Sequence, residues 1–180
     1  DDLSATGGEN VEFKMTFSNK SRDQIKNFKS TPEQRYVSHD YNAASRSSAK
    51  GIEVVVPDDA SEEEKEIIRE YVTDGSAFFK GNNAEGSSKI RRKEGLITTK
   101  ELGNGMSGVF HLEPFFGLDE GAKNAIKSNP KGYAEIIKRT LGKLNATLIA
   151  PHTEKAQGAD TAGESEREFY LKYIYPYLNQ

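Results

Sequence analysis

Short apolar runs alternate with amphipathic segments along this chain of 180 residues. The segment from Val11 to Phe17 alternates apolar and polar residues, which predicts a half-buried strand. Runs rich in β-branched and aromatic residues predict further strands, and about six are expected in all. The clearest of these runs lie at residues 36–39, 52–56, 109–113 and 146–150. The first ten residues are polar and contain glycine, so we expect a loop there.

Helical patterns separate the strands. Ser61 is expected to be the N-cap of a helix, with Glu64 at the capping-box position and apolar residues at helical spacing up to Phe78. Other helices are predicted at residues 118–128, 132–144 and about 164–178. Because strands alternate with helices, we expect a single α/β domain. Its sheet should be twisted and mostly parallel, with helices on both faces.

Composition narrows the function classes. The chain is 34% hydrophobic and 29% charged, and it has no apolar run of about 18 residues that would span a membrane. Its net charge of −3 argues against a nucleic-acid partner. Cysteine is absent, which excludes disulfides, thiolate metal sites and cysteine nucleophiles. The chain starts at Asp1 without a signal-peptide pattern, so we expect a trimmed or processed chain.

Ionisable residues stand at the ends of several predicted strands. His39 ends one strand, His111 and Glu113 end another, and His152 follows a third. Residues beyond the strand ends of an open α/β sheet converge on one crevice. Two histidines and a carboxylate are ligands that a catalytic zinc uses. One of the glutamates that open the last helix, Glu164, Glu166 or Glu168, could supply that carboxylate.

Each of these residues also has an ordinary structural explanation. His39 alone is more typical of a partly buried structural histidine than of a metal ligand. The glutamates of the last helix are also typical of the acidic first turn that a helix dipole favours. Two histidines and a glutamate at strand and helix ends indicate a zinc site more specifically than any one of these residues does.

Several segments resemble one known family. The stretch VSHDYNAA at Val37–Ala44, followed by SSAKGIE at Ser47–Glu53, resembles a strand end, small-residue loop and next strand of the zinc-dependent N-acetylmuramoyl-L-alanine amidases (amidase type 3 family). FHLEPFF at Phe110–Phe116 is similar to the late strand end that holds the family's catalytic glutamate. Ile90–Lys93 resembles the basic turn that precedes this strand, and the helices around Asn129-Pro130 match the family's end.

The beginning of the family pattern is found at the other end of this chain. Ala146–His152 resembles the family's first strand with its zinc histidine, and Glu166–Leu171 resembles the first helix with its zinc glutamate. The resemblance therefore covers the chain in circularly permuted order. Residues 1–145 correspond to the second part of the pattern, and residues 146–180 correspond to the first strand and helix. Val11–Phe17 should then lie in the same sheet as residues 146–150 and parallel to them.

The resemblance implies a zinc-dependent hydrolase that cuts the amide between N-acetylmuramic acid and L-alanine. It implies that His39, His152 and Glu166 hold the zinc, with Glu164 as the fallback ligand, and that Glu113 is the catalytic base. Asn42 is a candidate substrate contact, and Tyr41 beside it is another. We expect His111 to lie on the opposite face of its strand from Glu113, which leaves it out of the site.

Two other functions remain open at this point. One is a peptidoglycan-binding or regulatory module of the same fold that has no turnover. The other is a metal-free ribonuclease or toxin that uses His39, His111 and His152, although the net charge of −3 disfavours it. For the amidase, the expected partner is peptidoglycan, and the expected location is the cell wall or the secreted fraction, including that of a phage lysin. The sequence does not indicate an oligomeric state.

Overall fold

The structure is a computed structural model, and it describes residues 4–6, 13–14, 35–39, 51–57, 59–82, 88–90, 109–149, 160–161 and 164–178. All structural statements below concern these residues.

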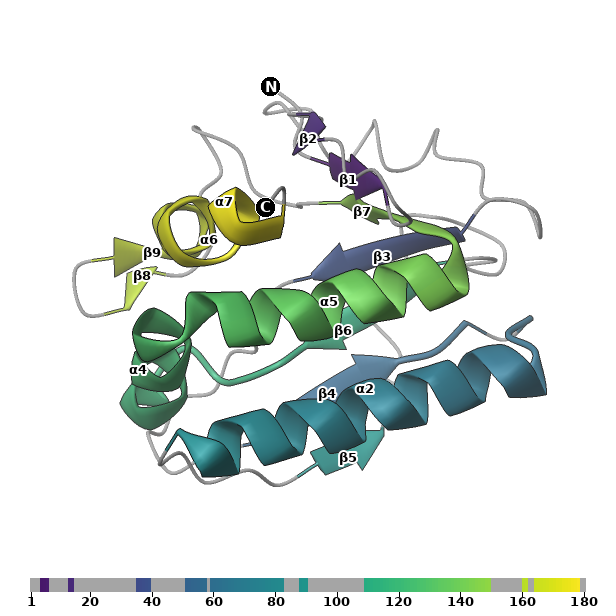
Figure 1. Cartoon of the computed structure of the whole chain (residues 1–180), viewed down its shortest axis with the longest axis horizontal. Coiled ribbons are helices and arrows are strands. Elements are labelled where there is room, and N and C mark those ends of the chain that lie inside the picture. Colours follow the sequence, from purple (N-terminus) through teal and green to yellow (C-terminus); the bar gives the residue numbers. More distant parts are fainter. Residues whose placement is uncertain are drawn as a thin grey trace.

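Seven strands form one sheet in the order β2-β1-β7-β3-β6-β4-β5 (Figure 1). The four central strands are β7 (Ala146–Ile149), β3 (Arg35–His39), β6 (Val109–Glu113) and β4 (Ile52–Val55). Three shorter strands flank these four: β1 (Ser4–Thr6) lies next to β7, and β2 (Phe13–Lys14) and β5 (Ser88–Ile90) form the two edges of the sheet. A separate pair is formed by β8 (Asp160–Thr161) and β9 (Glu164–Ser165). The apolar runs at the four central positions were therefore correctly predicted to be strands.

The main sheet is mixed, not mostly parallel as predicted. Strands β7, β3 and β6 are parallel neighbours, whereas β4 runs antiparallel to β6 and parallel to β5. Two more antiparallel pairings connect β1 to β7 and β2 to β1. The composition of an apolar run is the same whichever way the strand runs. The direction of a strand is therefore decided only when it pairs with its neighbours.

The N-terminal segment contributes to this sheet. Ser4–Thr6 is a strand, where the polar sequence predicted a loop. Phe13–Lys14, the described part of the predicted strand at residues 11–17, lies in the same sheet as β7. Because it is connected to β7 through two antiparallel pairings, it runs in the same direction as β7. Strand β1 lies between them, so the two are parallel but not adjacent.

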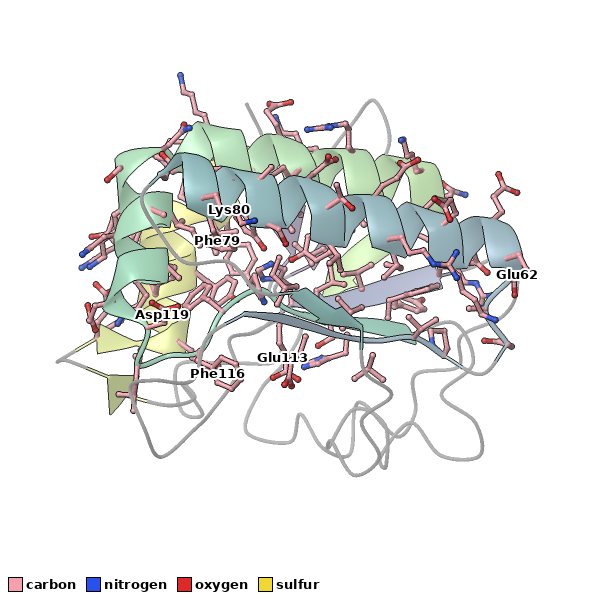
Figure 2. The ribbon with its side chains drawn as sticks, turned by 90° about the horizontal axis from the view of Figure 1, so that it is seen from below. Glu62, Phe79, Lys80, Glu113, Phe116 and Asp119 are labelled. Carbon is pink, nitrogen blue, oxygen red and sulfur yellow. The ribbon has the colours of Figure 1, made fainter. Side chains whose placement is uncertain are left out.

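The long helices α2 (Glu62–Gly81) and α5 (Pro130–Leu144) lie side by side on one face of the sheet (Figure 2). We call this the helix face, and the opposite side the far face. Figure 1 shows α4 (Glu120–Ser128), α6 (Glu166–Tyr173) and the short α7 (Tyr175–Leu178) gathered at one end of the fold. Helices on both faces were predicted, but within the described ranges both long helices cover the same face.

The start of α2 forms as its sequence predicts. The Glu64 amide donates to the Ser61 hydroxyl over 3.1 Å, and the Ser61 amide donates to the Glu64 carboxylate over 3.0 Å. These two bonds satisfy backbone donors that a helix start leaves without partners. Helix α5 begins at Pro130, two residues earlier than predicted, with the Asn129 side chain accepting from the Gly132 amide. Proline is favourable in a first turn, where its missing N–H costs nothing.

The hydrophobic core lies between the sheet and the helix face. Alternate residues of the central strands point into it, and register pairs join Val37 to Phe110 and to Leu148, and Val54 to Leu112. All five side chains are fully buried. Their apolar area, removed from water, is the main source of stability that brings the strand ends into a common position.

Candidate functional site

The carboxyl ends of β7, β3 and β6 lie next to one another, because the three strands are parallel neighbours. The N-terminal end of α6 belongs to the helix cluster at the same end of the fold (Figure 1). His39 and Glu113 are the last residues of β3 and β6. The backbone therefore places the ends of these three parallel strands at one edge of the sheet.

His39 is buried on the helix face at the end of β3. Its Nε2 atom lies 2.7 Å from the Tyr133 hydroxyl oxygen, which in turn lies 2.9 Å from the Tyr71 hydroxyl oxygen. Burial raises the pKa of both tyrosine hydroxyls, so both stay protonated. The imidazole ring also meets the ring of Tyr170 edge-on, with 5.1 Å between centroids. His39 is therefore held by α5 from one side and by α6 from another.

Glu166 is the first residue of α6 and is 4% exposed. Tyr170 follows it by four residues, so both stand on one side of the helix, and Tyr170 contacts His39. Ser165 is the N-cap, with its hydroxyl accepting from the Glu168 amide over 3.2 Å. The fold thus brings the helix start that carries Glu166 toward the strand end that carries His39.

Glu164, the fallback ligand, has a different environment. It lies in β9, outside the helix, and its carboxylate forms ion pairs with Lys127 at 3.9 Å and Lys172 at 3.7 Å. Two lysines near one carboxylate compete with a metal ion for it. Glu166, in contrast, is buried in the first turn of α6.

Glu113 emerges on the far face, away from α2 and α5 (Figure 2). The register explains this placement, because His39 pairs with Leu112, and the next residue along β6 points to the other side. His39 and Glu113 therefore share the carboxyl edge of the sheet, but the structure does not bring them together on one face.

His111 lies beside Glu113, with 3.4 Å between Nε2 and the carboxylate oxygen. The prediction that these two residues lie on opposite faces was wrong. They are separated by one residue, Leu112, and residues two apart in a strand share a face. His39 and His111, in contrast, lie on opposite faces, since His111 pairs with Ser38. A ribonuclease site built from these histidines loses support from this arrangement.

Buried polar side chains form a row on the far face: Ser38, His111, Glu113 and Glu53. Glu53 pairs directly with Glu113 across β4 and β6. Within the described part of the chain, the Ser38 hydroxyl and the His111 Nδ1 atom make no hydrogen bond. Sequence reasoning missed Ser38 and Glu53 as members of one group. The alternation along each strand was visible, but the register that aligns the strands was not.

Three of the candidate residues, His152, Asn42 and Tyr41, lie outside the described residues. The described part of β7 ends at Ile149, three residues before His152. Among the described residues, no group of three or more histidine, aspartate and glutamate side chains could hold a metal ion. The predicted zinc set has two described members, His39 and Glu166, and its third member, His152, lies outside the described residues.

A comparison with known protein families, curated proteins and solved structures finds no match to this chain. Within the described ranges, no helix has the length and apolar character needed to cross a membrane.

Proposed function

We propose that this chain is a zinc-dependent hydrolase that cuts the amide between N-acetylmuramic acid and L-alanine in peptidoglycan, with the amidase pattern in permuted order. His39, His152 and Glu166 would hold the zinc. The proposal rests on the resemblance of the motifs and on one observation above the others. His39 ends the middle one of three parallel strands, and its ring packs against the helix that begins with buried Glu166.

The donor set suits zinc. A zinc-binding histidine usually makes a hydrogen bond through its second ring nitrogen, which orients the ring. Tyr133 already binds His39 Nε2, so His39 would bind metal through Nδ1. Glu166 supplies a buried carboxylate, and His152 follows the strand next to β3. When bound, the metal would lower the pKa of a water molecule and polarise the scissile carbonyl group.

In this proposal, Glu113 is the general base. It would take a proton from the attacking water and pass it to the leaving amine of L-alanine as the C–N bond breaks. Glu113 is the last residue of β6, one position beyond the partner of His39. A site that uses both residues would lie over the carboxyl edge of the sheet, where side chains from either face can reach. Peptidoglycan would approach that edge.

The test combines metal analysis with product analysis. Purified protein should hold about one zinc ion per chain, and it should release new L-alanine amino termini from isolated cell walls. Exhaustive chelation should stop this release, and added zinc should restore it. A protein that holds no zinc after reloading, or whose activity survives chelation, would contradict the proposal. Zinc and cell-wall binding without new amino termini would instead support the non-catalytic module.

The ribonuclease alternative makes a different prediction in the same experiments. Its activity would act on RNA and would survive chelation. A His39→Ala variant and a His111→Ala variant would then both lose that activity.

A further inference from the structure

A chain of hydrogen bonds connects the two long helices to the end of β3. Tyr71 of α2 contacts Tyr133 of α5 over 2.9 Å, and Tyr133 contacts His39 Nε2 over 2.7 Å. Each of the three side chains is no more than 1% exposed. Polar groups at such depth are costly unless they bond to one another. Two buried tyrosine hydroxyls therefore form a hydrogen-bonded unit with His39, the proposed metal ligand.

The protons in this unit can be arranged in two ways. In the first, Tyr71 donates to Tyr133 and Tyr133 donates to His39 Nε2, which leaves the imidazole proton on Nδ1. In the second, His39 Nε2–H donates to Tyr133 and Tyr133 donates to Tyr71. The first arrangement belongs to the tautomer of His39 with its proton on Nδ1, and the second belongs to the tautomer with its proton on Nε2.

We propose that Tyr133, supported by Tyr71, is a positioning residue of the zinc site. Its hydroxyl holds the His39 ring so that Nδ1 is the metal-binding nitrogen, and with metal at Nδ1 the hydrogen bonds run from His39 through Tyr133 to Tyr71, as in the second arrangement. This inference rests on the proposed function, because it needs zinc at His39. It adds two residues and a ring nitrogen that the amidase motifs do not include.

The direction of the hydrogen bonds with metal bound follows from proton balance. A neutral imidazole ring carries one proton, so when metal occupies Nδ1 that proton is on Nε2. Nε2 is then the donor, and the Tyr133 oxygen accepts from it. The Tyr133 hydroxyl proton turns to the Tyr71 oxygen. A tyrosine hydroxyl can serve in both ways because it both donates and accepts, which a phenylalanine ring cannot.

The first experiment compares zinc affinity in Tyr133→Phe with that in Tyr36→Phe. Both variants lose one buried tyrosine hydroxyl, but Tyr36 lies on the far face of β3. Loss of a side chain that orients a metal ligand typically weakens metal binding by about 10-fold to 100-fold. We expect that loss for Tyr133→Phe and less than about a threefold change for Tyr36→Phe. Tyr71→Phe should have a smaller effect than Tyr133→Phe, because it acts through Tyr133.

The second experiment observes the His39 ring nitrogens by NMR in unaltered protein, before and after zinc is added. With zinc at Nδ1, we expect the ring proton on Nε2 and a shift of the Nδ1 signal that reports the bound metal. This measurement shows which ring nitrogen of His39 binds zinc even if Tyr133→Phe does not fold. Zinc bound through Nε2, or Tyr133→Phe affinity equal to that of the unaltered protein, would overturn the inference while the proposed function stands. Absence of zinc binding at His39 in the unaltered protein would overturn both.

Discussion

The two faces of strand β3 have different chemistry although their residues alternate along five positions. On the helix face, Arg35 pairs with α2, Val37 packs in the core, and His39 bonds to Tyr133. On the far face, Tyr36 and Ser38 are buried, and Ser38 pairs with His111. Neighbouring residues in the sequence thus belong to different environments.

The comparison indicates how the proposed site is divided. The helix face would hold the metal ligands through packing and hydrogen bonds. His39 packs against Tyr170, and Glu166 lies one helical turn before Tyr170 in α6. The far face would supply Glu113, which is held by His111. Substitutions on the helix face should therefore change metal affinity or stability, and those on the far face should change the rate.

The largest expected effect is on the far face. Glu113→Gln should lower the rate of amide hydrolysis by about 100-fold, which is typical for loss of a positioned general base. Zinc affinity should stay within about threefold of the unaltered value, since Glu113 is not a proposed ligand. The measurements are release of L-alanine amino termini and zinc titration.

Glu135→Gln is the matched control, because Glu135 is an exposed carboxylate of α5. It should leave both quantities unchanged. If Glu113→Gln loses its zinc instead, the assignment of Glu113 and Glu166 to base and ligand would have to be exchanged. If the rate is unchanged, Glu113 is not the base and the far face has no part in catalysis.

The next effect concerns stability on the helix face. Arg35 is 7% exposed, and its guanidinium donates two bonds of 2.8 Å to the Glu64 carboxylate. It also donates to the Asp59 carboxylate over 3.1 Å and to the Asp59 backbone oxygen over 3.3 Å. Arg35→Met should lower the free energy of unfolding by about 2 kcal/mol, less than for a fully buried pair because Asp59 is partly exposed. Urea unfolding at pH 7 measures this. Arg69→Met, which breaks an exposed pair with Glu66, should cost less than about 1 kcal/mol.

A smaller effect tests how closely α2 approaches the sheet. A Cβ atom added at Gly75 would lie 2.8 Å from the Ile52 Cδ1 atom, whereas one added at Gly81 would meet nothing within 4 Å. Both positions belong to α2, where alanine is favoured over glycine by up to about 1 kcal/mol. We expect Gly75→Ala to be less stable than Gly81→Ala by about 1 to 2 kcal/mol in urea unfolding. Equal stability would show that Ile52 moves aside freely.

The smallest effect is a pH dependence from Glu64. Burial raises its pKa, but hydrogen bonds from Arg35 and Ser61 and the charge of Arg35 outweigh it, so the pKa lies below the ordinary 4.5. Between the lower pKa of the folded state and the ordinary pKa of the unfolded chain, the unfolded chain binds more protons than the folded protein. The free energy of unfolding therefore rises with pH between these two values. The stabilisation is complete above about pH 4.5 and is lost as pH falls through the lower pKa of the folded state.

Glu64→Gln tests this dependence. The difference in unfolding free energy between the unaltered protein and this variant should shrink as pH falls from 7 to 3, by less than about 1 kcal/mol because Glu64 is partly exposed. Glu63→Gln removes an exposed glutamate next to it and is the control for the loss of one negative charge. A constant difference for Glu64→Gln would mean that Arg35 does not favour the charged carboxylate.

The start of α2 and the four central strands were predictable from the sequence, because each depends on residues only a few positions apart. Ser61 and Glu64 lie three residues apart, so their reciprocal bonds depend on one helical turn. The four central strands follow from short runs of apolar and β-branched residues. The positions of His39 and Glu113 at strand ends follow from where those runs stop.

By itself, the sequence determined these helices, strands and strand ends, because capping and periodicity act between residues a few positions apart. Only the tertiary structure shows that β4 is antiparallel to β6. It also shows that Tyr133 and Tyr71 are hydrogen-bonded in a chain that ends at His39. The residues that share the far face are likewise known only from strand register: Ser38, His111, Glu113 and Glu53. Each of these depends on strand register or on packing between residues far apart in the chain. A one-residue shift in register would move every side chain of a strand to its other face. Because β3 and β4 are buried on both faces, the pattern within these strands does not specify that choice.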